Sequence, residues 1–164
     1  MAHALSTSPC LTDQEQTLYG ATIAQQEREH ASVSMEWAAR HGWTSRAGVT
    51  PHAVLAQREA RVFLRLPEPM RTAYILATVR LIEMQAVHGF TALAARFEQT
   101  AETRPMADDY RQIVQDERMH VAASRRIARR LGALDPDFRR IERQAFRLAS
   151  QVYGPLVLDS VWRP

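Results

Sequence analysis

The stretch that decides the fold runs from Tyr110 to Leu131 and reads YRQIVQDERMHVAASRRIARRL. Its apolar residues recur every three or four positions, which is the period of an α-helix with one face toward a core. That face also carries a glutamate and a histidine one turn apart near its middle, where burial is expected to be deepest. The stretch therefore predicts a long core helix with ionisable groups buried at its centre. The positions on this face are Tyr110, Ile113, Glu117, His120, Ser124, Ile127 and Leu131.

Two other segments repeat this pattern. Residues 19–37 place Glu27 and His30 on a mostly apolar face, and residues 76–97 place Glu83 on another. Because each face carries a carboxylate near its middle, the three faces are expected to converge in one core. The other members of the two stripes are Tyr19, Ile23, Ser34 and Trp37, and Leu76, Val79, Val87, Phe90, Ala94 and Phe97.

Capping and breaking residues divide the chain into helices. Thr12 and Glu15 match a capping box that opens the first helix, and Gly42 ends it. Proline or glycine marks each later break. The expected helices span residues 12–42, 51–66, 69–103, 106–131 and 136–153, followed by an apolar tail over residues 156–162 that packs back on the bundle. The sequence predicts an all-α bundle of about five helices that forms one domain over residues 1–164, with residues 1–11 as a mobile tail.

Composition excludes several classes of function. The 164 residues are 46% apolar and 24% charged, which is typical of a globular domain. All 21 cationic residues are arginine, so neither a P-loop lysine nor a Schiff-base lysine is present. Cys10 is the single cysteine, which excludes an internal disulfide and a cysteine metal cluster. No membrane span or secretory signal is recognisable, so we expect a cytoplasmic protein with no membrane partner.

The excess of positive charge is small, with a formal net charge of +3 and a sequence pI of about 9.6. Arginines alternate with glutamates on most segments, so we do not expect a nucleic-acid partner. One stretch is densely basic, and it is either a solvated helix face or a docking surface for an acidic partner. Its members are Arg125, Arg126, Arg129, Arg130, Arg139, Arg140, Arg143 and Arg147.

Three buried carboxylates would repel one another unless a cation lies between them. In two of the stripes a histidine follows the glutamate by three residues, so both side chains lie on one face and can bind one ion. Carboxylate oxygen combined with neutral imidazole suits iron or manganese. The alternative is a set of buried hydrogen bonds between glutamate and histidine or arginine. The predicted metal ligands are Glu27, His30, Glu83, Glu117 and His120.

Residues 26–30, QEREH, and 116–120, DERMH, resemble the two Glu/Asp-Glu-x-x-His segments of the soluble acyl-carrier-protein desaturases, a family of ferritin-like di-iron proteins. Glu83 stands where that family has its third-helix glutamate, and His88 with the following glycine resembles a nearby His-Gly pair. The resemblance extends over about residues 18–153.

The resemblance implies a ferritin-like bundle that holds two iron ions, or manganese in place of iron. Glu27 and His30 would then ligate iron. Glu83 and Glu117 would bridge the two irons or ligate one of them, and His120 would hold the second iron. It also implies O2-dependent desaturation or hydroxylation of an acyl chain on acyl carrier protein, with electrons from a ferredoxin. Because acyl carrier protein is acidic, it would give the arginine-rich stretch a partner.

The chain departs from that family at two places. The family has an earlier helix with one more terminal glutamate, for which this chain shows no counterpart. Glu15 lies about 18 Å before Glu27 along the same helix, which is too far to substitute, and Glu59 reads as a surface residue. Ala86 stands where the family has a threonine near the oxygen site.

These departures keep three functions open. The first is the O2-dependent di-iron oxidoreductase. The second is a metal-binding but non-catalytic subunit that docks on a complete homologue. The third is a metal-free helical adaptor whose buried glutamates pair with arginine. Because one wall of the bundle is missing, we also expect a homodimer or a complex with a companion subunit.

Overall fold

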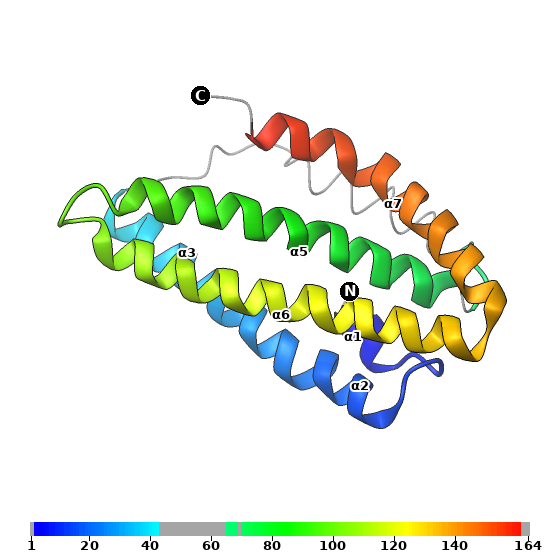
Figure 1. Cartoon of the computed structure of the whole chain (residues 1–164). Coiled ribbons are helices and arrows are strands. Elements are labelled where there is room, and N and C mark those ends of the chain that lie inside the picture. Colours follow the sequence, from blue (N-terminus) through cyan, green and yellow to red (C-terminus); the bar gives the residue numbers. More distant parts are fainter. Residues whose placement is uncertain (1, 43–64, 69, 162–164) are drawn as a thin grey trace.

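The structure is a computed structural model of the chain, and it describes residues 2–42, 65–68 and 70–161. The side chains of residues 2, 3, 149 and 151–161 lie outside this description. The described ranges are helical apart from short turns, which confirms the all-α helical bundle (Figure 1). The elements are α1 (Ala2–Ser6), α2 (Asp13–Thr17), η1 (Leu18–Ile23), α3 (Ala24–Arg40), α5 (Met70–Phe97), α6 (Arg104–Leu134) and α7 (Pro136–Val161).

The first long helix is built from α2, the π-helical turn η1 and α3, which follow one another without a break. The capping box is confirmed, since the Thr12 N–H donates to Glu15 Oε2 at 2.9 Å and the Glu15 N–H donates to Thr12 Oγ1 at 3.3 Å. Gly42 follows with a φ of 64°, a left-handed conformation that glycine adopts without strain. Local capping therefore defines both ends of this helix.

The last helix begins at Pro136 as predicted, but three later helix ends differ from the predicted ones. The helix expected over residues 69–103 ends earlier, at Phe97. Gly132 was expected to end the next helix, but α6 continues to Leu134. A Cβ on Gly132 would lie 2.9 Å from Arg139 Cγ, so this glycine allows α7 to approach closely rather than ending a helix. Finally, α7 runs through Gly154 and the proline after it, as far as Val161.

Two earlier expectations cannot be followed in the described residues. Residues 51–64 of the short helix expected over 51–66, with Glu59, lie outside them, and so do the side chains that would show the packing of the tail over residues 156–162. No helix in the described part of the chain is both long and apolar enough to cross a lipid bilayer.

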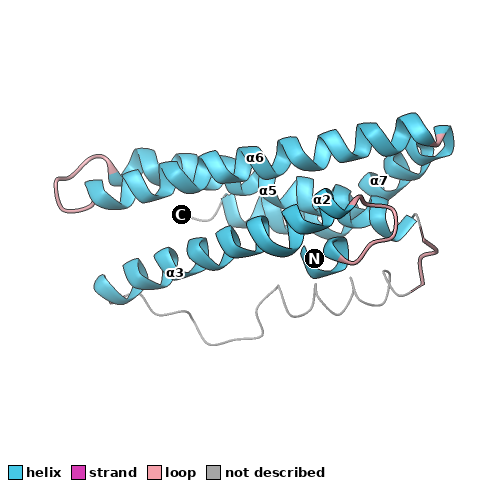
Figure 2. Cartoon of the chain, turned by 90° about the horizontal axis from the view of Figure 1, so that it is seen from below, coloured by secondary structure: helices cyan, strands magenta, loops and turns pink. Residues whose placement is uncertain are grey.

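Helix α5 is the centre of the packing, because it lies between α6 and α7 (Figure 1). In contrast, α3 contacts α6 at few points and is set apart from α5 and α6 over much of its length (Figure 2). One apolar cluster includes Tyr19, Leu76 and Ile127, and a second includes Trp37 and Tyr110. The ionisable residues of the three stripes lie between these clusters along the helices.

The N-terminal segment packs against the bundle instead of forming the expected mobile tail. Leu5 is 0% exposed and Leu11 is 6% exposed. Ser8 Oγ lies 2.7 Å from Thr72 Oγ1 on α5, and the Arg130 guanidinium donates to the Cys10 carbonyl at 3.3 Å. The two leucines cover an end of the larger apolar cluster that would otherwise face solvent. Their sequence neighbourhood is too short to show the periodicity that marks a buried helix.

Candidate metal centre

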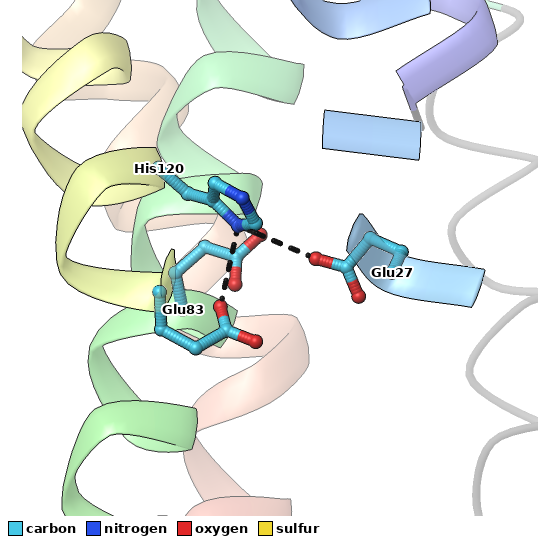
Figure 3. Close-up of side chains that lie close together, drawn as sticks. Glu27, Glu83 and His120 are labelled. Carbon is cyan, nitrogen blue, oxygen red and sulfur yellow. Dashed lines mark ion pairs between the residues drawn. The ribbon is translucent and has the colours of Figure 1, made fainter. Parts of the chain in front are cut away.

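Four of the five predicted ligands meet in the middle of the bundle. Glu27 comes from α3, Glu83 from α5, and Glu117 and His120 from α6. One ligand atom from each lies within 4.8 Å of those of the others, and Figure 3 shows Glu27 and Glu83 pointing toward His120. Glu83, Glu117 and His120 are buried, whereas the Glu27 side chain is 46% exposed. The group can therefore hold a metal ion, with Glu27 on its solvent side.

The Nδ1 atom of His120 is the focus of this group. It lies 3.4 Å from Glu27 Oε1, 3.5 Å from Glu117 Oε2 and 3.7 Å from Glu83 Oε1. These separations are longer than good hydrogen bonds, and the buried Nδ1 and Glu117 Oε2 have no hydrogen-bond partner. Donor atoms on one metal ion lie about 3 Å apart, since each is about 2.1 Å from the ion. The spacing and the unsatisfied buried atoms both fit a bound cation.

His30, the fifth predicted ligand, lies beside the group rather than in it. Its Nδ1 is 3.2 Å from Glu117 Oε1, and its ring centroid is 6.2 Å from that of His120. Its Nδ1 is also buried without a hydrogen-bond partner. Glu117 therefore presents one carboxylate oxygen to each imidazole, which is the arrangement of a ligand that can bridge two ions.

Two orienting residues were not predicted from the sequence. Gln26 Oε1 lies 3.0 Å from His120 Nε2, and Asp116 Oδ2 lies 3.1 Å from His30 Nε2. An oxygen that accepts the Nε2 hydrogen leaves Nδ1 free to bind a metal and holds the ring in place. Each residue directly precedes the glutamate of its own helix and serves the histidine of the other. That position was the signal that could have identified them.

The electrostatics of the metal-free centre follow from burial and crowding. Burial, with a smaller contribution from the neighbouring Glu117 and Glu27 carboxylates, raises the pKa of Glu83 to about 8, although His120 acts to lower it. Burial alone would lower the pKa of His120, but Glu117, Glu27 and Glu83 outweigh it and raise the pKa to about 11. Burial likewise opposes ionisation of Glu117, yet the adjacent imidazoles of His120 and His30 favour the charged carboxylate and hold its pKa well below the usual range. At neutral pH, a proton on Glu83 therefore removes the charge of that carboxylate, and the protonated His120 offsets charge on the neighbouring carboxylates.

Metal binding at pH 7 is therefore expected to displace about two protons, one from Glu83 and one from His120, because a ligand must be deprotonated. Isothermal titration calorimetry with Mn²⁺ in buffers of different ionisation enthalpy measures this number. Metal affinity should rise with pH by about tenfold per unit for each displaced proton. A binding enthalpy independent of the buffer would contradict this assignment.

The same shifts predict how the stability of the metal-free protein depends on pH. Both groups bind protons more tightly when folded, Glu83 from 4.5 to about 8 and His120 from 6.5 to about 11. Each group contributes fully to the free energy of unfolding when the pH is below its pKa in the unfolded chain. This contribution is lost as the pH rises toward the pKa of the group in the folded protein.

A cavity of about 560 Å³ lies beside the centre, between the η1–α3 helix and α5. Glu27, His30, Glu83 and Glu117 form its polar wall, and Ala86 lies on its apolar wall, where the resemblance expects a threonine. Such a volume with a few convergent polar groups is typical of a small-molecule site. The remaining lining residues are Tyr19, Ile23, Ala31, Ser34, Val79, Ile82 and Phe90.

A basic groove of about 400 Å³ lies between α5 and α6 and shares no described lining residue with the cavity. Its arginines, Arg118, Arg125, Arg126 and Arg129, have no carboxylate within 4 Å in the described ranges. Arg130, in contrast, pairs with Glu15. The groove therefore carries positive charge that the described chain leaves uncompensated. Its other lining residues are Met84, Val87, His88, Val121 and Ala122.

Comparison of the chain with known protein families, with curated proteins and with solved structures gives no significant match. The metal centre, the cavity and the groove are therefore the features from which the function is inferred.

Proposed function

We propose that the chain is a di-iron, O2-dependent oxidoreductase that desaturates or hydroxylates an acyl or related small-molecule chain. One observation carries the proposal. Glu117 directs an oxygen to a buried, unsatisfied Nδ1 of each of two histidines, with two further carboxylates beside it. Buried carboxylates around imidazole, with room for other ligands, suit iron or manganese.

The five predicted ligands and the cavity wall each have a role in this proposal. Glu27, Glu83, Glu117, His30 and His120 would hold the two ions in a ferritin-like bundle, as the resemblance implies. With iron bound, the centre supplies the O2 chemistry by which di-iron carboxylate proteins oxidise C–H bonds. The apolar wall of the cavity would hold the chain next to the centre.

The overall reaction needs an external reductant. Desaturation converts a CH2–CH2 unit, O2, two electrons and two protons into a CH=CH unit and two molecules of water. Hydroxylation uses the same O2, electrons and protons, but one oxygen atom enters the chain and the other leaves as water. A ferredoxin-type protein would supply the electrons.

We propose the basic groove as the docking site for that acidic electron donor. Met84, Arg118 and Val121 line it, and each directly follows a metal ligand, which places it about 100° further around the same helix. A protein bound there lies one helix away from the centre and leaves the cavity open. Acyl carrier protein, the acidic partner that the resemblance also implies, is the alternative occupant.

Reversing two charges in the groove should weaken this docking. The double variant Arg125→Glu, Arg129→Glu is expected to bind a ferredoxin at least about tenfold more weakly, with a smaller dependence on salt. Surface plasmon resonance at low and high salt measures both effects, with acyl carrier protein as a second analyte. Arg28→Glu, an exposed position on α3, is the matched control. If the double variant bound ferredoxin as tightly as the unmodified protein, the groove would not be the docking site.

The test of the function begins with metal content. Elemental analysis after anaerobic ferrous loading should find iron, and O2 with a reduced ferredoxin should then oxidise an offered acyl chain. Mass spectrometry of acyl-carrier-protein and free-acid substrates detects loss of two hydrogens or gain of an oxygen. Absence of bound metal would refute the proposal.

A non-catalytic, metal-binding subunit is the second candidate. Ala86 on the cavity wall favours it, because the resemblance places a threonine there for the oxygen chemistry. So does the wide separation of α3 from α5, which fits a homodimer or a companion subunit that completes the bundle. Bound iron without product from any chain, together with a stable complex in sedimentation velocity, would support this candidate.

A further inference from the structure

The two histidines of the centre differ in the carboxylates around them. The space beside His120 Nδ1 is bordered by oxygens of Glu27, Glu83 and Glu117, and we call it the inner position. The space beside His30 Nδ1 is bordered by Glu117 Oε1, and we call it the outer position. Asp116, the other carboxylate within 4 Å of His30 among the described residues, contacts the opposite ring nitrogen.

This difference makes the two positions unequal as metal sites. The inner position has four protein donors, one of them imidazole nitrogen, whereas the described residues give the outer position two. Iron and manganese take more ligands than two, so the outer position needs donors from elsewhere. His30 Nδ1 is nonetheless buried without a hydrogen-bond partner, in a residue only 8% exposed. A buried, unsatisfied nitrogen aimed at a carboxylate is an incomplete site rather than a finished hydrogen bond.

The open side of the outer position faces the cavity. His30 and Glu117 both line the 560 Å³ space, and so do Glu27 and Glu83 of the inner position, whereas His120 is not among its described lining residues. Beyond these polar groups the wall continues with Ile82, Ala86 and Phe90. A ligand that enters the cavity therefore meets the donors of the outer position, the neighbouring carboxylates of Glu27 and Glu83, and an apolar wall.

We infer that a small-molecule carboxylate with an apolar chain completes the outer position, so that a free carboxylic acid is the class of substrate or effector. This inference rests on the proposed metal-binding function. A carboxylate supplies the hard oxygen donor that the site lacks, and its charge offsets that of a second divalent ion beside the buried His30 and Glu117 side chains. A cavity of this volume with apolar walls suits such a chain better than one protein side chain, which would leave most of it unfilled.

The test titrates the protein anaerobically with Mn²⁺ and follows free Mn²⁺ by electron paramagnetic resonance, with octanoate or the neutral control octanol present. One ion is expected to bind in every case. Octanoate, but not octanol, should tighten binding of a second ion by at least about tenfold. In His30→Ala the first ion should remain and the octanoate effect should vanish, whereas His120→Ala should weaken the first ion.

Each contrary result has a distinct meaning. Absence of any bound Mn²⁺ would refute the proposed function itself. Two ions bound equally tightly without octanoate would overturn only the inference, as would an octanoate effect that survives in His30→Ala. Loss of the second ion in Glu59→Gln would show that the chain supplies its own donor. A second ion that binds only at concentrations where sedimentation velocity shows a dimer would assign the donor to a second copy.

Discussion

Glu117→Gln is expected to lower the affinity for the first Mn²⁺ or Fe²⁺ ion by more than about a hundredfold. Changing a residue that merely orients a metal ligand lowers metal affinity by about 10–100-fold. Glu117 has a more direct role, because it presents one carboxylate oxygen to each of the two imidazoles. Glutamine keeps the shape of the side chain but loses its charge and one of the two oxygens. Metal content after dialysis and the Mn²⁺ titration both measure the loss.

Asp108→Asn is the matched control for this substitution. Asp108 also lies on α6, but its exposed carboxylate pairs with Arg111 at 2.6 Å, away from the centre. This variant should bind metal like the unmodified protein, and both variants should keep their helical circular dichroism signal. If Glu117→Gln retained full metal affinity, the ion would bind at another place, and the buried Glu–His cluster would not be the metal site.

Leu5→Ala is expected to lower the free energy of unfolding by about 2–5 kcal/mol, as other buried leucine truncations do. Leu5 is fully buried against the larger apolar cluster, so its removal leaves a cavity as well as losing transfer free energy. For a chain of this length the thermal midpoint should fall by about 5–15 °C. Thermal unfolding followed by circular dichroism in metal-free buffer gives the value.

Pro9→Ala is the control for the N-terminal segment, because Pro9 lies between the two buried leucines and is itself exposed. It should change the free energy of unfolding by less than about 0.5 kcal/mol. A Leu5→Ala variant as stable as Pro9→Ala would mean that the segment does not pack on the bundle in solution. The mobile tail expected from the sequence would then be the better description.

The sequence by itself determined the helices, because the signals for them act within a few turns. The capping box at Thr12, the left-handed glycine at Gly42 and the three-to-four spacing of apolar residues all depend on neighbours close in the chain. The same spacing put a carboxylate on each stripe. A buried charge needs a partner, so the sequence alone predicts a cation between these carboxylates.

Only the tertiary structure decided which of these groups meet. Gln26 with His120 and Asp116 with His30 are pairs separated by more than 80 residues, and no local period links them. Distances between helices also made His30 a neighbour of the four-residue group and left Glu27 half exposed.

Close approach between helices explains the remaining differences. Gly132 reads locally as a helix stop, but the side chain of Arg139 occupies the space that its missing Cβ leaves. Leu5 lacks a recognisable period, yet the bundle leaves an apolar end for it to cover. Helix formation depends on hydrogen bonds and side-chain spacing along the chain, whereas burial and ligand geometry depend on which surfaces the packed helices bring together.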